Sequence, residues 1–367
     1  NKFYPISRFM ITIVFLVSSI VILNSISYLS ISDPYLLISY ITLLQLSMIS
    51  SVLSHDIIIT SFYWDLSGLI SHVPINFWSS KINCGIKAVL YNKIGDNFSS
   101  SLSTILYPPL AFISYYPELS YPIPPPFAIY LLVIYHSFFS NYAILIPQLV
   151  PLSLLSIPYS KSAQLPSPTR LLNATPAPTP IPAPSHSSTM VIAGVFSGII
   201  IDDMIIIIMD YFPLVHPFLH LVPLNTLLRP LFKAILLSDI KSIIALPTIS
   251  QISYMFIAPL LNPILCSYHI VIHPLFKSIL FSFAGSLIHI QYNYQNIYQI
   301  KTNYKFYWLT YLLTSNISIL SISKEIIIHD IFPFINPPFP SIILNLGAVF
   351  TTLYTSKTLL YCFWFLL

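Results

Sequence analysis

The stretch FMITIVFLVSSIVILNSISYLSIS, residues 9–32, decides the fold class because it contains no charged side chain. It is longer than the roughly 20 apolar residues that a helix needs to cross a bilayer. Its apolar residues are continuous and do not alternate with polar ones, which argues against the strands of a membrane β-barrel. The stretch therefore predicts a membrane-spanning helix.

The composition extends this prediction to all 367 residues. Apolar residues make up 56% of the sequence and charged residues only 7%, compared with roughly 45–50% and about 25% in soluble domains. We therefore expect an all-α polytopic membrane protein with about eleven transmembrane helices. The predicted spans are residues 9–30, 35–55, 57–77, 86–115, 127–160, 183–210, 216–238, 241–260, 264–290, 306–329 and 341–365.

The clearest interruption of these runs is the segment 165–185, which contains seven prolines. Proline cannot continue an unbroken helix, and in lipid such backbone must be buried in protein or line a watery cavity. The polar segments 81–97 and 292–305 predict loops with adjoining helix ends. We expect one integral membrane domain over residues 1–367, with a broken helix near its middle.

The charge and cysteine content argues against several classes of function. The net charge of +4 is small and scattered, whereas nucleic-acid binding needs Lys and Arg clustered on one face. Cys84, Cys266 and Cys362 lie far apart, so they predict buried free thiols and no disulfide or metal framework. Only 7 glycines are spread through the chain, so a glycine-rich phosphate loop is not expected.

A group of acids and histidines near residues 202–220 has side chains that could bind a metal. Its members are Asp202, Asp203, Asp210, His216 and His220. Acids beside a membrane exit are more typical of a solvated helix end than of a cation site, so we expect no metal here.

Ionisable residues inside the predicted spans are the most informative, because a charge in a bilayer core is costly unless it faces partners or water. His269, His273 and Lys277 follow an i, i+4, i+8 spacing, which places all three on one face of a helix. A proton relay needs such a row. For any single histidine, the alternative is a structural bond to a neighbouring carbonyl. Asp65, Lys161, His186, Lys324 and Glu325 also lie in or beside apolar runs.

Several sets of motifs follow one another along the chain. The longest consists of Lys161-Ser-Ala-Gln-Leu, Ala177-Pro-Thr-Pro180 and His186-Ser-Ser-Thr-Met-Val-Ile-Ala-Gly-Val195. The others are Trp64-Asp65 with Tyr91-Asn-Lys-Ile-Gly-Asp96, Ser238-Asp-Ile-Lys-Ser-Ile-Ile-Ala245 with Ser250-Gln251, the row from His269 to Lys277 with Gly285-Ser286 and His289, and Ser323-Lys324-Glu325. Together they resemble subunit 5 of the proton-pumping NADH:ubiquinone oxidoreductase (respiratory complex I). The sister antiporter-like subunits 2 and 4 fit the His186 element less well.

The resemblance implies a fold of two inverted five-helix repeats, each with a broken helix. Repeat one would cover about residues 33–180 and repeat two about residues 183–330, followed by a truncated C-terminal helix at about 341–365. The family pattern has further helices at both ends and a lateral helix. We therefore expect separately encoded subunits to replace the missing terminal helices.

The resemblance also implies roles in a proton pathway. Asp65 would pair with Lys161 and modulate its proton affinity, and His186 would connect this first half-channel to a central axis. Position 65 is Asp where the family has Glu, which shortens the reach toward Lys161 by one methylene. Residues 168–172 replace the family's Ser-Ser-Trp-Leu-Pro element, and Arg170 is a new charge there.

In the same scheme, His269, His273 and Lys277 continue the central axis, and Lys324 with Glu325 forms the second half-channel. A buried lysine suits this work because burial disfavours its charged form, so a nearby carboxylate can switch it between two protonation states.

We therefore expect a proton-translocating subunit of the NADH:ubiquinone reductase, with no redox centre of its own. Flavin, iron–sulfur clusters and quinone would belong to partner subunits, and the adjacent antiporter-like subunit 4 would be a neighbour. The alternatives are a stand-alone monovalent cation/proton antiporter, which shares the broken-helix design, and a non-conducting membrane scaffold. The Ile-, Tyr-, Phe- and Asn-rich composition suits an organelle-encoded, multi-pass protein of the mitochondrial inner membrane, surrounded by lipids.

Overall fold

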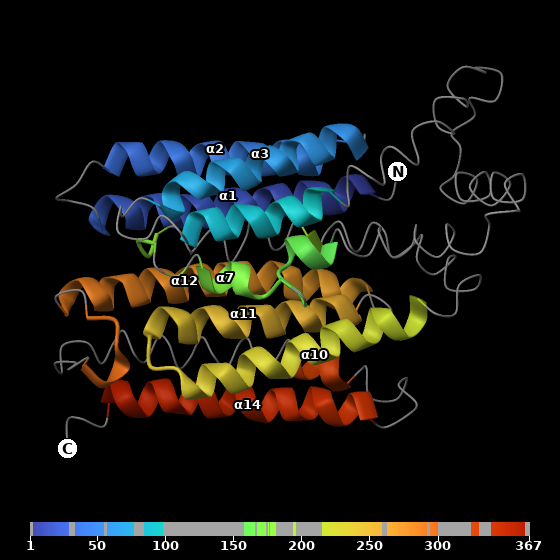
Figure 1. Cartoon of the computed structure of the whole chain (residues 1–367), viewed down its shortest axis with the longest axis vertical. Helices are drawn as coiled ribbons and strands as arrows, with labels where there is room; N and C mark the ends of the chain where they lie inside the picture. The colour runs from blue at the N-terminus through green and yellow to red at the C-terminus, as the bar shows by residue number, and fades with distance from the viewer. Residues whose placement is uncertain are drawn as a thin grey trace, which may run out of the picture.

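The computed structural model describes residues 3–28, 34–54, 57–76, 84–97, 158–165, 167–173, 175, 177–180, 194–195, 215–258, 263–291, 294–299, 324–329 and 339–363. These ranges are helical apart from short turns and contain no β-strand, so the all-α prediction is confirmed. The long helices lie with their axes roughly aligned (Figure 1).

The helix bounds follow the predicted spans closely. The helices are α1 (Phe3–Tyr28), α2 (Pro34–Leu53), α3 (Ile57–Ile75), a helix over residues 84–97, α7 (Thr169–Asn173), α10 (Val215–Leu236), α11 (Ile240–Ile257), α12 (Pro263–Ile290), the short η4 (Ile297–Gln299), a helix over residues 324–329, and α14 (Phe339–Phe363). The segment 84–97, part of which we expected to be a loop, is helical. Most of the predicted spans 127–160, 183–210 and 306–329, and residues 98–115 of the span 86–115, lie outside the described residues.

Several helices are suited to a bilayer. The segments Ser7–Ile26, Tyr35–Leu53, Ile240–Ile257 and Ile264–Ile290 are long and apolar enough to cross a membrane. The outer faces of the helices carry large apolar side chains, with Leu23, Tyr35 and Ile264 mostly exposed. Such a surface is unfavourable in water and favourable in lipid. The chain is therefore a multi-pass membrane protein.

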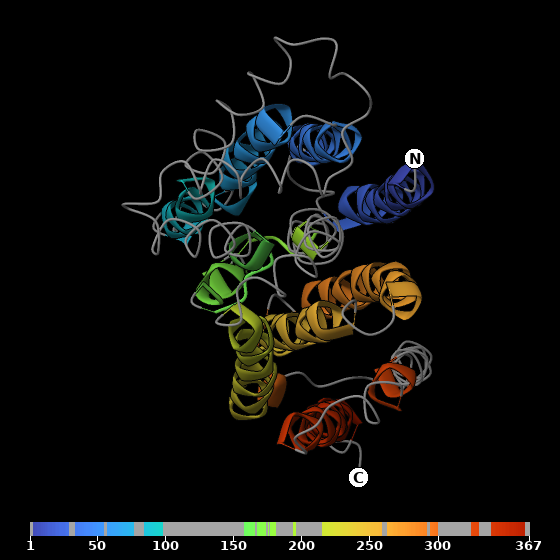
Figure 2. The same cartoon turned by 90° about the vertical axis from the view of Figure 1, so that its right-hand side faces the viewer.

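The helices form two groups with the broken segment between them. Figures 1 and 2 show α1, α2 and α3 on one side and α10, α11, α12 and α14 on the other. The short pieces between residues 158 and 180, drawn in green, lie between the groups, and α1 packs against α12. The residues around Lys161 are therefore enclosed from both sides.

Two contacts fasten α14 to the second group. The buried Tyr254 hydroxyl on α11 donates to the Leu344 carbonyl on α14 at 2.9 Å. Near the other end of α14, Lys357 Nζ donates to the carbonyls of Ile235 and Leu237 at 2.5 and 2.6 Å. The last carbonyls of a helix have no partner in the helix itself, so Lys357 satisfies the C-terminal end of α10.

Most serine and threonine hydroxyls bond inside their own helix. Ser47 Oγ donates to the Leu44 carbonyl on α2, and Ser278 Oγ donates to the Leu275 carbonyl on α12, both at 2.8 Å. The same bond to the residue three positions earlier recurs on α1 and α14. These hydroxyls are therefore satisfied in an apolar surrounding without a partner helix.

Candidate functional site

Lys161, the lysine beside the broken segment, is buried and paired. Its side chain ends a helical turn over residues 158–161 and is 4% exposed. The Nζ atom forms an ion pair and a hydrogen bond with the carboxylate of Asp96, on the helix 84–97. It also lies over the ring of Trp64 on α3, with 5.7 Å between Nζ and the ring centroid. Three segments far apart in the sequence thus enclose one cation.

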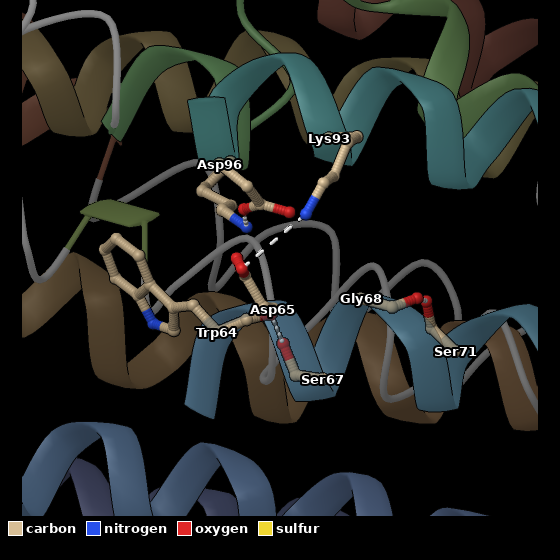
Figure 3. Close-up of polar contacts among 8 residues, drawn as sticks. Trp64, Asp65, Ser67, Gly68, Ser71, Lys93 and Asp96 are labelled. Atoms are coloured by element: carbon tan, nitrogen blue, oxygen red, sulfur yellow. Dashed lines mark hydrogen bonds and ion pairs between the residues drawn. The ribbon is translucent and has the colours of Figure 1, made fainter. Parts of the chain in front are cut away.

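Asp65, the expected partner of Lys161, binds a different lysine. Its Oδ2 atom lies 3.9 Å from Lys93 Nζ, as the dashed line in Figure 3 marks. Figure 3 also shows the Asp65 and Asp96 side chains meeting between α3 and the helix that carries Asp96. Asp96 is therefore the direct ion-pair partner of Lys161. Asp65 also lies within electrostatic range of Lys161, and the pairing of Asp65 with Lys161 stays a prediction.

The two acids differ in position and exposure. Both are aspartates of the same length, but Asp96 bonds directly to Lys161, whereas the carboxylate of Asp65 lies 3.9 Å from Lys93 Nζ. The Lys93 and Asp65 side chains are 62% and 40% exposed, whereas the Asp96 side chain is 6% exposed. The buried lysine thus pairs with the buried carboxylate, and the pair of Asp65 with Lys93 is the more exposed of the two.

A Schellman motif ends the helical turn at Lys161. The Gln164 amide donates to the Tyr159 carbonyl at 2.9 Å, and the Ala163 amide donates to the Ser160 carbonyl at 3.3 Å. These two bonds define the motif. Ala163 takes its left-handed position, with φ 59°, which glycine usually occupies. The helix break that the prolines predict therefore begins just after Lys161.

Gln164 ties this break to α10 and α11. Its Oε1 atom accepts hydrogen bonds from Thr226 Oγ1 and, at 3.1 Å, from Ser253 Oγ. Its Nε2 atom donates to the Ile249 carbonyl at 3.4 Å, and the two hydroxyls lie 2.7 Å apart. The three side chains are completely buried. The sequence analysis missed this cluster, although a glutamine so close to a buried lysine in an apolar chain is a usable signal.

Glycines allow two other segments to approach the turn closely. A Cβ atom on Gly194 would lie 3.0 Å from the Ser162 nitrogen and 3.2 Å from the Lys161 carbonyl carbon. A Cβ atom on Gly95 would overlap the Ser160 hydroxyl. The end of the His186 to Val195 motif therefore packs directly on the backbone of Lys161. His186 itself lies outside the described residues.

The row on α12 faces the protein interior, as its spacing predicts. His269, His273 and Lys277 are 0%, 0% and 2% exposed. The two imidazole centroids are 5.8 Å apart, and Lys277 Nζ donates to the Ile244 carbonyl on α11 at 3.3 Å. Neither ring nitrogen of His273 bonds to a described residue.

Lys324 and Glu325 do not share one environment. Lys324 is buried, and its Nζ atom donates to Thr351 Oγ1 on α14 at 2.7 Å. Glu325 is exposed. Lys324 is thus the interior member of this expected pair, and the sequence analysis did not identify Thr351 as its partner.

A further buried lysine, Lys241, was not singled out from the sequence as ionisable. It lies in the motif that begins at Ser238, and its Nζ atom donates to the Ala177 carbonyl at 2.9 Å. It thereby links this motif to the Ala177 to Pro180 motif. Among the described residues, no group of His, Cys, Asp and Glu could hold a metal ion, and residues 202–210 lie outside them.

Comparison with known proteins supports the resemblance. The chain is 32% identical to NADH-ubiquinone oxidoreductase chain 5 of Candida parapsilosis, with 86% of this chain and 56% of that protein covered. It is 31% identical to NADH-quinone oxidoreductase subunit L of Buchnera aphidicola, with 74% and 42% covered. The chain thus spans about half the length of the curated relatives it matches.

Solved structures and family models agree on the fold. A chain of the Mrp complex from Dietzia sp. superposes with a TM-score of 0.78 at 20% identity, covering 97% of this chain and 39% of that chain. At this identity the likeness shows the fold alone. The family model described as "NADH:quinone oxidoreductase/Mrp antiporter, TM" matches residues 127–323. Because this match covers more than half of the sequence, the chain belongs to the NADH:quinone oxidoreductase/Mrp antiporter membrane family.

Proposed function

We propose that the chain is a proton-translocating membrane subunit of NADH:ubiquinone oxidoreductase (complex I). The observation that carries this proposal is the buried row of His269, His273 and Lys277 on α12. Three ionisable groups, one turn apart and shielded from water, cost free energy in an apolar helix. A purely structural helix has no use for them, whereas a proton relay requires them.

The other buried lysines extend the row into a pathway. Lys161 with Asp96 forms the first half-channel, in which the buried carboxylate stabilises the protonated lysine. Lys324 with the Thr351 hydroxyl forms the second half-channel, because a hydroxyl both accepts and donates a hydrogen bond and here holds the lysine in the interior. His186 connects the first half-channel to the row. Asp65 and Glu325, the more exposed acids, supply protons to the two lysines or receive them.

The fold and the setting follow the same proposal. The chain forms two inverted repeats, which cover about residues 33–180 and about residues 183–330, and each repeat contains one half-channel. The relatives are named as subunits of NADH oxidoreductases, so this chain works among partner subunits, with an antiporter-like subunit 4 beside it. The partners hold the flavin, the iron–sulfur clusters and the quinone, and this chain holds no redox centre. The assembly lies in the mitochondrial inner membrane, and the chain is organelle-encoded.

Lys277→Met in the assembled complex tests the proposal. In sealed membrane vesicles, NADH oxidation is followed by absorbance and the pH gradient by a fluorescent amine. We expect the number of protons moved per NADH to fall, because the row loses its terminal proton carrier. Tyr268→Phe, on the exposed face of the same helix, is the matched control and keeps the wild-type ratio. An unchanged ratio in Lys277→Met contradicts the proposal and favours a scaffold.

A cation/proton antiporter is the second candidate, because the matching family model names Mrp antiporters as well. The two functions differ in their driving force. An antiporter changes the pH of vesicles when Na⁺ is added without NADH, and Lys277→Met abolishes that change. A complex I subunit changes the vesicle pH only while NADH is oxidised.

A further inference from the structure

The exposed face of α10 carries two cations. Arg229 and Lys233 are four positions apart, so they lie one above the other on the helix, and both are exposed. Neither forms an ion pair with a described carboxylate. The opposite face of α10, with Leu227 and Leu231, is completely buried. In a chain with 7% charged residues, two exposed charges that have no carboxylate partner in the part of the chain that the structure describes require an explanation.

The two charges lie near one end of the helix. The axial rise of 1.5 Å per residue puts Lys233 about 4.5 Å, and Arg229 about 10 Å, from the last residue, Leu236. We infer that this end of α10 lies at a membrane surface, because long basic side chains extend toward such a surface and place their charges at the level of the headgroups. They are not needed to cap α10, because Lys357 already bonds to the Ile235 carbonyl.

Apolar side chains flank the two cations. Leu221, Phe232 and Leu236 are each more than half exposed on the outer face of α10. The face thus offers positive charge near the membrane surface and an apolar surface along the helix. A phospholipid has the complementary arrangement, with a phosphate at its head and acyl chains below it.

We propose that Arg229 and Lys233 bind the phosphate of an anionic phospholipid on the outer face of α10. The planar Arg229 guanidinium binds two phosphate oxygens at once, and the Lys233 ammonium adds a point charge beside it. The acyl chains lie against Phe232 and its apolar neighbours. A carboxylate on a helix of a neighbouring subunit would also neutralise the two cations. It would not account for their position at the level of the lipid headgroups. This proposal does not depend on proton translocation.

The experiment uses the assembled complex in phosphatidylcholine nanodiscs that contain a photoactivatable lipid. The lipid is either phosphatidylglycerol, which is anionic, or phosphatidylcholine, which has no net charge, and labelled peptides are identified by mass spectrometry. We expect phosphatidylglycerol to label the α10 peptide preferentially in the wild-type complex. The preference falls as salt is added, because the attraction is electrostatic.

Variants assign this preference to the two cations. Each cation near a membrane surface contributes about 1 kcal/mol to anionic-lipid binding, so Arg229→Gln with Lys233→Gln lowers the preference by roughly 30-fold, equivalent to about 2 kcal/mol. The charge-conserving pair Arg229→Lys with Lys233→Arg keeps most of it. The matched control, Arg8→Gln with Lys87→Gln, removes two exposed cations elsewhere and leaves labelling of α10 unchanged.

Two results overturn the proposal. One is equal labelling of α10 by both lipids in the wild-type complex, a measurement that needs no variant. The other is a crosslink from a photoreactive residue at position 229 to a carboxylate-bearing helix of another subunit in native membranes. If the neutral double variant does not assemble, the wild-type labelling and the charge-conserving pair still decide the question.

Discussion

Lys161 and Asp96 form a buried ion pair across 65 positions of sequence. Their side chains are 4% and 6% exposed, so neither charge is screened by solvent. Removing one partner of a buried pair is more damaging than removing both, because the remaining charge stays buried alone. This relationship gives the first test of the site.

Asp96→Asn is expected to lower the free energy of unfolding by about 3–5 kcal/mol and to reduce the protons moved per NADH. Thermal unfolding of the purified complex and vesicle acidification measure the two effects. Asp65→Asn is the control for the unfolding measurement alone, because its partly exposed pair with Lys93 contributes at most about 1 kcal/mol. The double variant Asp96→Asn with Lys161→Met recovers stability but not pumping. Equal losses of stability in Asp96→Asn and Asp65→Asn would contradict the assigned pair.

Gly194→Ala is expected to destabilise the site by about 1–3 kcal/mol, as overpacking does. The added Cβ meets backbone atoms of Lys161 and Ser162, which cannot rotate away. Gly68→Ala is the matched control, because its nearest neighbour, a side-chain atom of Asn92, lies at an ordinary 3.4 Å. Thermal midpoints of the two variants provide the comparison, and a larger drop for Gly68→Ala would refute the packing argument.

Ala163→Gly is expected to stabilise the protein by about 0.5–1 kcal/mol. The left-handed φ of 59° costs an L-residue about 1–2 kcal/mol, and glycine avoids this cost. Glycine also loses more conformational entropy on folding, which offsets about 0.5–1 kcal/mol of the stabilisation. The midpoint of thermal unfolding should therefore rise. A lower midpoint would mean that the alanine methyl group contributes more by packing than its backbone conformation costs.

Gln164→Ala is expected to loosen the break after Lys161. The Ile249 carbonyl loses its donor from Gln164, and the hydroxyls of Thr226 and Ser253 lose their shared acceptor. All three groups keep another partner, because Thr226 also donates to the Pro223 carbonyl and Ser253 to the Ile249 carbonyl. The cost is therefore that of the lost hydrogen bonds, about 0.5–1.5 kcal/mol each. Hydrogen exchange at the amides of Ala163 and Gln164 should become faster. Gln164→Met keeps the volume but not the hydrogen bonds, so wild-type exchange in that variant would show that volume alone holds the turn.

The row on α12 could be predicted because its geometry is local. A helix fixes which residues share a face, so the spacing of His269, His273 and Lys277 is enough to place them together. The apolar face around them then indicates that they are buried. The helix spans were predictable for the same reason, since length and composition of a run decide whether it crosses a membrane.

The partner of Lys161 could not be predicted in this way. Asp65 and Asp96 both occur in motifs of the family, and the choice between them depends on how α3 and the helix 84–97 pack around the lysine. That packing is decided by contacts such as the approach of Gly95 to Ser160. The Gln164 cluster is a similar case, because it joins residues 62 and 89 positions apart. A local sequence pattern cannot predict contacts between residues that are so far apart in the chain.

The hydroxyl bonds within the helices have a consequence for synthesis of the chain. A serine such as Ser47 is satisfied by its own helix, so a segment rich in serine can leave the ribosome and enter the lipid on its own. The segment that carries Lys161 enters lipid at a higher free-energy cost, because the counter-charge of Lys161 belongs to another segment. Asp96 is made earlier, and its helix is already available when Lys161 arrives. The order of these two residues along the chain thus shortens the time that Lys161 spends without its counter-charge.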